Sequence, residues 1–298
     1  MTTHTTAKGF TLQTYAAPPP NFDISSVGDS DRAQFGFSAF DDNVDLQERL
    51  ASTLKGYRFL EPLFEAREIA PLDVQNLSTE AAALPTQSWS GAILSGSTSD
   101  PICWVQGSWT VPSIAPPTGA PGGIFYAASP WVGIDGIGSR DILQAGCDAQ
   151  ITPDNAVRYR VWYEWYPEDS NYIPNMPLSP GDVLSVSIKL YPGSNTSAAI
   201  IFANQSKGVA CNFALTAKPG FALVGNCAEW IVESEPQLGT LANFGIVNFT
   251  GCRAGAVSGA MAGVTTATPV LMIDASRNLQ SAGEIVGAND VRVRFVRG

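Results

Sequence analysis

Histidine is almost missing from this chain of 298 residues, because its one histidine, His4, lies in a Thr-rich N-terminus that we expect to be disordered. Ser-His-Asp and Cys-His nucleophile systems need a folded imidazole, as do most zinc hydrolases. The sequence therefore excludes these catalytic classes. Any hydrolysis by this chain must be carried out by carboxylates, amides or hydroxyls.

Charged residues and long apolar runs are also scarce. Charged residues make up 15% of the chain, against about 25% in a typical protein, and the net charge is −10. Nucleic-acid binding needs clustered Lys and Arg, so we expect no nucleic-acid partner. No stretch approaches the roughly 18 apolar residues of a membrane-spanning helix, and the opening residues lack the apolar segment of a secretory signal.

Paired short-range cysteines are absent too. The five cysteines show no Cys-x-x-Cys spacing, so a closed zinc site is not expected. One or two disulfides with a spare thiol, or five buried free thiols, both fit the sequence. The five residues are Cys103, Cys147, Cys211, Cys227 and Cys252.

Residues 1–85 differ in composition from residues 86–298, since they hold 12 of the 27 acidic residues and 6 of the 17 basic ones. Residues 17–40 are typical of a loop. Asp45 begins a possible capping box, and Leu46, Leu50 and Leu54 recur at helical spacing. A second short amphipathic segment spans 59–70. We interpret 1–85 as an N-terminal extension, which is an arm packed on the main domain, a removable or inhibitory pro-segment, or a disordered tail.

From residue 86 onward, short apolar runs alternate with turn sequences. This pattern predicts an all-β sandwich or barrel of antiparallel sheets. One of the strands, at 183–191, alternates apolar and polar residues and is expected to be half exposed. The predicted strands are 102–111, 124–134, 156–166, 183–191, 198–203, 209–215, 228–233, 244–249, 270–273 and 291–296.

The most aromatic strand, at 159–166, has two contrasting faces, because alternate side chains of a strand point to opposite sides. Val161, Tyr163 and Trp165 share a face that reads as core. Trp162 and Glu164 share the other face, which sets a carboxylate among aromatic rings. This second face is typical of a binding floor.

Two other predicted strands carry polar side chains in apolar surroundings. Glu229 and Glu233 share one face of the strand at 227–234, which is costly unless that face is wet or functional. A solvated outer face is the simpler interpretation for this strand. Gln144 lies in the apolar run 142–146, where an ordinary cross-strand hydrogen bond would also explain it.

Taken together, five ordered blocks resemble the glutamic peptidases, or eqolisins, which are pepstatin-insensitive acid endopeptidases best known from fungi. The resemblance covers residues 86–298 and implies a sandwich of two curved antiparallel sheets, similar to concanavalin-type lectins and glucanases. The blocks are SGAIL (90–94), WVGIDG (131–136), ILQAG (142–146), WYEWYP (162–167) and AEWIVE (228–233).

The resemblance implies a catalytic dyad at Gln144 and Glu233, with no metal or other cofactor. Glutamate has an ordinary pKa of about 4.3, so its carboxylate can act as a base in acid, while a glutamine amide donates to an oxyanion without titrating. We therefore expect an acid endopeptidase that acts on polypeptides, as a secreted monomer despite the lack of a visible signal. The resemblance places substrate-binding positions at Trp89, Trp131, Asp135 and Glu164.

Two alternatives use the same kind of sandwich. A glycoside hydrolase would use Glu164 and Glu233 as acid and nucleophile, and would not need Gln144. A carbohydrate-binding module would use exposed aromatic side chains without turnover. The extension 1–85, Arg160 and the cysteine positions all depart from the fungal pattern.

Overall fold

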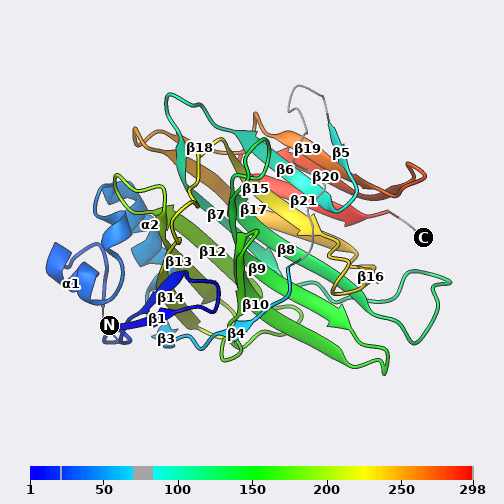
Figure 1. Cartoon of the computed structure of the whole chain (residues 1–298), viewed down its shortest axis with the longest axis horizontal. Coiled ribbons are helices and arrows are strands. Elements are labelled where there is room, and N and C mark those ends of the chain that lie inside the picture. Colours follow the sequence, from blue (N-terminus) through cyan, green and yellow to red (C-terminus); the bar gives the residue numbers. More distant parts are fainter. Residues whose placement is uncertain (21, 70–82, 297–298) are drawn as a thin grey trace.

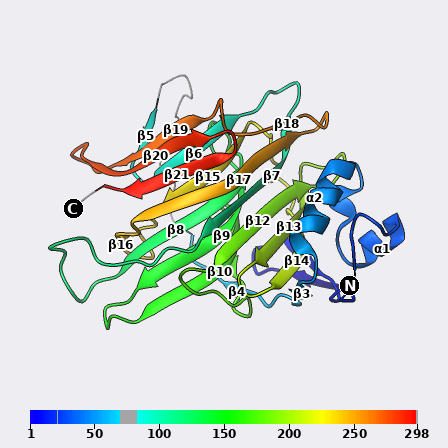
Figure 2. The same cartoon turned by 180° about the vertical axis from the view of Figure 1, so that it is seen from behind.

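The computed structural model describes residues 1–20, 22–69 and 83–296, which form two packed layers of curved strands with two helices at one end of the molecule (Figures 1 and 2). Among these residues every strand pairing is antiparallel except β3 with β14, β5 with β19 and β16 with β8. The expected all-β sandwich with a partly helical N-terminal part is confirmed.

The first layer carries the predicted site. Its strands pair in the order β4 (Glu65–Ala66), β11 (Asp169–Tyr172), β10 (Val157–Tyr166), β9 (Ile142–Ile151), β8 (Tyr126–Ile134), β15 (Cys227–Glu233) and β6 (Trp89–Ser95).

The second layer packs behind the first. Its strands pair in the order β1 (Thr2–Thr5), β2 (Thr11–Thr14), β14 (Val209–Thr216), β13 (Ser197–Asn204), β12 (Val183–Leu190), β7 (Ile102–Thr110) and β17 (Ile246–Ala256).

Three strands at the C-terminal end connect the two layers into one continuous hydrogen-bonded sheet: β19 (Thr268–Ile273), β20 (Leu279–Gly287) and β21 (Asp290–Phe295). The remaining strands are short: β3 (Arg58–Phe59), β5 (Leu84–Thr86), β16 (Thr240–Leu241) and β18 (Met261–Ala262).

The main hydrophobic core lies between the layers. Val161, Tyr163 and Trp165 of β10 belong to this core, whereas Trp162 belongs to a separate apolar cluster on the outer face of the first layer. The two faces predicted for this strand are therefore confirmed. We call the outer face of the first layer, formed by outward-pointing side chains of β6, β8, β9, β10 and β15, the concave face.

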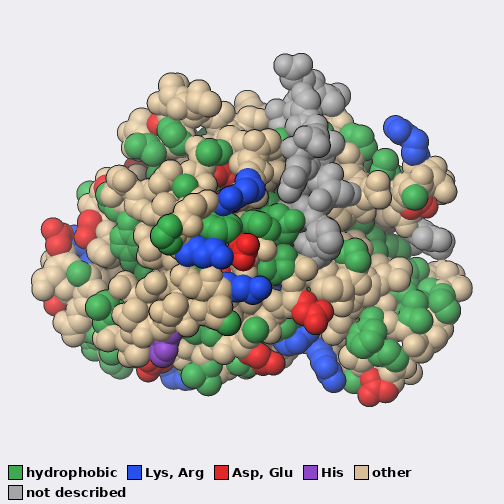
Figure 3. Space-filling model, in the orientation of Figure 1, with side chains coloured by type: hydrophobic (Ala, Val, Ile, Leu, Met, Phe, Trp, Pro, Cys, Tyr) green, Lys and Arg blue, Asp and Glu red, His purple; other side chains and the backbone are tan. Residues whose placement is uncertain are grey.

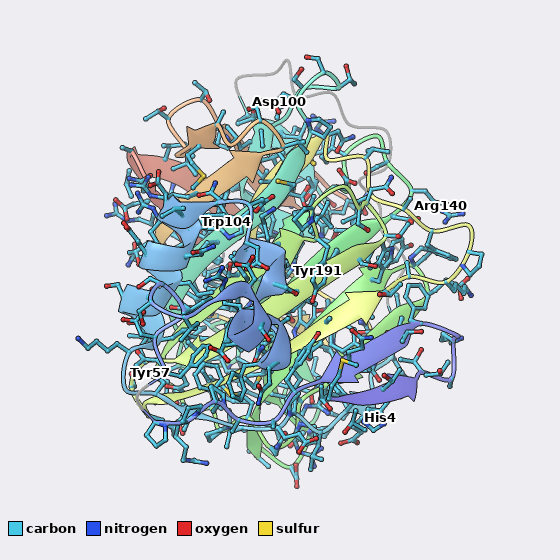
Figure 4. The ribbon with its side chains drawn as sticks, turned by 90° about the vertical axis from the view of Figure 1, so that its left-hand side faces the viewer. His4, Tyr57, Asp100, Trp104, Arg140 and Tyr191 are labelled. Atoms are coloured by element: carbon cyan, nitrogen blue, oxygen red, sulfur yellow. The ribbon has the colours of Figure 1, made fainter. Side chains whose placement is uncertain are left out.

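The N-terminal segment covers the outer face of the second layer. Helix α2 (Val44–Leu54) buries Leu46, Leu50 and Leu54 in one apolar cluster with Trp104 and residues of β13 and β14. Figure 4 shows this segment lying over the strands near Trp104 and Tyr191. The prediction of a half-exposed strand at 183–191 is wrong, because this cover buries Ser185, Ser187 and Lys189.

Four local predictions for the N-terminal segment are also wrong. Asn43, not Asp45, caps α2, since its Oδ1 accepts the Leu46 N–H at 3.0 Å. The described part of the 59–70 segment holds the short strands β3 and β4, and residues 17–40 hold α1 (Asp29–Gln34) and the 3₁₀ turn η1 (Ser38–Phe40). His4 is not disordered but lies exposed in β1, at the edge of a hairpin (Figure 4).

All five cysteines are free and buried. None of the described helices is long and apolar enough to cross a bilayer. The face seen in Figure 3 is mostly uncharged, with a small group of basic and acidic side chains near its centre, in keeping with the low charged content.

The concave face needs a glycine at 146. A Cβ there would lie 2.3 Å from the Pro130 carbonyl oxygen and 2.5 Å from the Trp131 Cβ. Backbone atoms cannot move aside, so we expect Gly146→Ala to lower the free energy of unfolding by about 2 kcal/mol in urea titrations. Gly122→Ala is the matched control, because nothing lies within 4 Å of its Cβ position. Equal stability of the two variants would contradict the packing described here.

Candidate active site

Strand alternation brings the predicted residues to the concave face. Gln144 on β9 lies directly opposite Gly133 on β8 and Glu164 on β10. Glu233 ends β15, opposite Trp89 on β6 and Ser129 on β8. The even-numbered positions of β9 and β10 and the odd-numbered positions of β8 and β15 share this face, so one register fixes the whole arrangement.

Trp131 links the two halves of the predicted dyad. Its indole N–H donates to Glu233 Oε2 at 2.9 Å. Its six-membered ring lies against Gly133. A Cβ added at Gly133 would lie 3.0 Å from Trp131 Cζ3 and 3.2 Å from Gln144 Cβ. The Trp89 ring packs edge-on against Trp131, with centroids 4.9 Å apart. Trp131 therefore bonds to Glu233 directly and lies, like Gln144, against Gly133.

The side-chain oxygen of Gln144 is buried and unpaired within the described residues. Its side chain is 2% exposed, and its Oε1 is buried with no hydrogen-bond partner in the described part of the chain. A buried polar atom without a partner costs about 1–3 kcal/mol, so such atoms in native proteins call for a functional explanation. A cross-strand hydrogen bond, the simpler interpretation of Gln144 from the sequence, does not form for this oxygen.

Glu233 sits in a strongly perturbed environment. Burial raises its pKa well above the ordinary value, and the nearby carboxyl groups of Glu235 and Glu164 raise it further. The indoles of Trp89 and Trp131 oppose this rise. A carboxyl group poised between these influences can both accept and release a proton, which is the requirement for general acid–base work.

The second carboxylate of this strand is buried as well. Glu229 is 0% exposed, and Glu233 is 4% exposed, so the solvated outer face considered from the sequence is wrong. Glu229 Oε1 accepts a weak bond from the Cys227 thiol at 3.5 Å, and Oε2 has no described partner. Burial raises the pKa of Glu229 well above its ordinary value, and the Asp135 charge adds to the rise.

Asp135 forms hydrogen bonds to the backbone of a neighbouring loop. It directly follows β8 at φ 70°, and its carboxylate accepts the backbone N–H groups of Val224 at 2.6 Å and Asn226 at 2.7 Å. These contacts tie the loop before β15 to the end of β8. Glu164, in contrast, lies within the concave face between Gln144 and Ser170.

Sequence reasoning missed three charged residues of this face. Asp148 lies on β9 four residues after Gln144, so the strand period could have found it. Glu235 follows the end of β15, so strand alternation does not predict which way its side chain points. Arg67 comes from the N-terminal segment, and nothing in the sequence indicates its position. Its guanidinium forms ion pairs with Asp148, Glu164 and Glu235.

In the described residues, no group of three or more His, Cys, Asp or Glu side chains is arranged to hold a metal ion. The side chains of this face offer instead one amide, several carboxyl groups and indole N–H donors. Such a set can activate a water molecule and stabilise an oxyanion.

The Peptidase A4 family profile matches residues 87–295. Aspergillopepsin-2 of Aspergillus niger is 32% identical over 187 residues, which are 57% of this chain and 64% of that protein. Scytalidopepsin B of Scytalidium lignicola is 34% identical over 146 residues, which are 49% of this chain and 50% of that protein. The chain thus spans less than two thirds of the length of either relative.

Solved structures agree with this. A scytalido-glutamic peptidase bound to a transition-state analogue inhibitor has a TM-score of 0.59 at 27% identity, covering 70% of this chain and 98% of that one. The aspergilloglutamic peptidase of Aspergillus niger has a TM-score of 0.52 at 31% identity, covering 57% and 99%. These similarities do not favour the glycoside hydrolase or the carbohydrate-binding alternative.

The burial of Glu229 predicts a pH-dependent stability. Because its folded pKa is raised, its contribution is complete below about pH 4.3 and falls as the pH rises, since the unfolded chain then releases a proton that the folded chain keeps. Glu229→Gln cannot ionise. Relative to the unaltered chain, we expect this variant to gain roughly 1–3 kcal/mol of unfolding free energy between pH 4 and pH 7.5, measured by urea titration. A difference that does not change with pH would show that Glu229 is already ionised in the fold.

Proposed function

We propose that this chain, a member of the peptidase A4 family, is an acid endopeptidase that hydrolyses polypeptides with Gln144 and Glu233 as its catalytic dyad. The observation that carries the proposal is that a buried amide, its oxygen unpaired within the described chain, and a perturbed carboxyl group share one face of a sheet, close to the Trp131 indole. The relatives of this chain are peptidases, which favours peptide hydrolysis as the reaction of these two groups.

Glu233 transfers protons, Gln144 stabilises the oxyanion and Trp131 positions Glu233. The ionised Glu233 takes a proton from the attacking water and later gives it to the leaving amine. The Gln144 amide donates to the oxyanion that develops on the peptide carbonyl, and it keeps this capacity at any pH because it does not titrate. The Trp131 N–H holds the carboxylate in place, which makes Trp131 a positioning residue.

The other predicted residues divide between the cleft and its support. Glu164 and Trp89 lie on the concave face, beside Gln144 and Glu233 respectively, where a bound peptide would contact them. Asp135 supports the cleft from its end by fixing the loop 224–226.

The N-terminal extension, residues 1–85, acts both as an arm and as a cover in this proposal. Its first part packs on the second layer through α2. Residues 65–69 lie across the concave face, with Arg67 among the carboxylates and Ile69 packed against the apolar cluster. Activity therefore requires that this cover leaves the face.

Removal of either dyad member should abolish proteolysis. We expect Glu233→Gln and Gln144→Ala each to lower casein digestion at about pH 3–4 by a hundredfold or more. Release of acid-soluble peptides measures the activity, and far-UV circular dichroism checks the fold. Glu284→Gln is the control, because its exposed carboxylate lies on β20 and should not affect turnover. A fully active Glu233→Gln enzyme would refute the dyad.

Self-processing gives a separate test of the cover. After incubation of the full chain at about pH 3–4, near the ordinary pKa of a glutamate, we expect intact mass spectrometry to show loss of roughly the first 85 residues. The Glu233→Gln chain should keep its full mass under the same conditions. Processing of both chains at equal rates would point to a contaminating protease rather than to this dyad.

A further inference from the structure

Arg67 occupies a pocket that is unusually complete for a single side chain. The side chain is 0% exposed. Its Nε and Nη2 donate to the two oxygens of Asp148 at 3.3 and 3.2 Å, and its Nη1 donates to Glu164 Oε2 at 3.0 Å. Nη2 also donates to Glu235. The guanidinium carbon lies 4.1 Å from the centre of the Trp162 ring, so the pocket has a stacking wall as well as three carboxylates.

The walls of this pocket are held by residues other than Arg67. Asp148 also accepts hydrogen bonds from the Ser129 and Tyr172 hydroxyls, each at 2.9 Å. Tyr172 is stacked in turn by Arg160, whose guanidinium carbon lies 3.8 Å from the ring centre. A pocket with this independent support keeps its shape when its occupant changes.

Its occupant, in contrast, comes from a separate part of the chain. Arg67 lies outside residues 87–295, whereas every wall of the pocket lies inside that range. Within the described part of the chain, the backbone around it is held by the two-residue strand β4 at the edge of β11, by the Arg67 N–H to Ser170 O at 3.0 Å, and by a side-chain contact from Gln237 to Glu68 O at 3.4 Å. A cavity of about 460 Å³ borders residues 66–69. An extended segment added to a sheet edge is also how many domains bind peptides.

Charge indicates what the pocket selects. Three carboxyl groups surround a single guanidinium, so the pocket offers more acidic groups than one cation needs. Burial, together with Glu235 and Asp148, raises the pKa of Glu164 to about 8 although Arg67 lowers it. The paired contact with Asp148 and the flat stack on Trp162 both match a planar guanidinium better than a lysine ammonium.

We propose that Asp148, Glu164 and Glu235, with the Trp162 ring, form a subsite of the peptide cleft that binds an arginine side chain of the substrate. Arg67 fills this subsite as an internal mimic of that side chain. The subsite adjoins the dyad, because Glu164 lies directly opposite Gln144 and Glu235 follows Glu233 by two residues. Its role in substrate choice rests on the proposed peptidase function, but its affinity for a guanidinium does not.

Binding is therefore tested first, without turnover. Arg67→Ala is introduced into the full Glu233→Gln chain, and calorimetry at about pH 9, above the pKa of about 8 that burial gives Glu164, measures the affinity for acetyl-arginine amide and for its uncharged isostere, acetyl-citrulline amide. We expect arginine to bind at least tenfold more tightly than citrulline. Arg158→Ala in the same background is the matched control, because Arg158 is exposed on β10 and its loss leaves the pocket filled.

A further Glu235→Gln substitution should reduce the arginine preference to a few fold, because it removes one carboxylate from the wall. A folded Arg67→Ala chain that binds both compounds equally would overturn the proposal. Should Arg67→Ala fail to fold, the cleavage measurement below tests the subsite with the unaltered chain.

Cleavage is tested second, with the acid-incubated unaltered chain and peptides in which one arginine is moved along the sequence and compared with citrulline at each position. We expect kcat/KM to be at least tenfold higher for arginine at one position. Equal cleavage at every position would overturn the subsite. Selective binding with no cleavage of any peptide would instead retain the subsite and contradict the proposed peptidase function.

Discussion

Several carboxyl groups lie out of water on one face of a β-sheet, and the structure around them depends on how their charge is compensated. An isolated buried carboxylate is strongly unfavourable, so each group needs a partner or a proton. Asp135 accepts backbone N–H groups, Glu233 accepts an indole N–H, and Glu164 pairs with Arg67. Among the described residues Glu229 has only a weak thiol contact, so a bound proton is its means of compensation.

The need to compensate buried charge also explains why the N-terminal segment packs against both layers. On the outer face of the second layer it supplies leucines of α2, and Asp42 pairs with the buried Lys189 at 3.1 Å. On the concave face it supplies the Arg67 guanidinium. Each layer of the sandwich therefore has one face closed by the core and the other closed, at least in part, by the first 69 residues.

The strand positions and the faces of the strands could be predicted from sequence because they depend on local alternation. The alternation along 159–166 correctly separated Trp162 and Glu164 from the core residues of β10. The same rule failed to give the exposure of 183–191, because burial there depends on the N-terminal segment at η1 and Asp42, more than a hundred residues away. Local patterns set which side a residue faces, whereas tertiary contacts set what covers that side.

The candidate site shows the same division. Gln144 and Glu233 were identified through block resemblance, and their strand register then placed them on one face. Asp148 could have been added from the strand period alone. Arg67 could not, because neither its spacing nor its neighbours distinguish it from a surface arginine on a short extended segment. Arg67 and Asp148 lie 81 positions apart, and no pattern in a single sequence predicts an ion pair between them.

The position of the guanidinium pocket also bears on how Glu233 can ionise. Glu235 and Glu164 raise the pKa of Glu233, and both are ligands of the cation in the pocket. A positive charge held there offsets their repulsion and so favours the ionised form of Glu233. Emptying the pocket removes that offset and makes the carboxylate harder to form. The occupant of the subsite and the protonation state of the base are therefore coupled through two shared carboxyl groups, and a substrate arginine would favour the base that attacks its own chain.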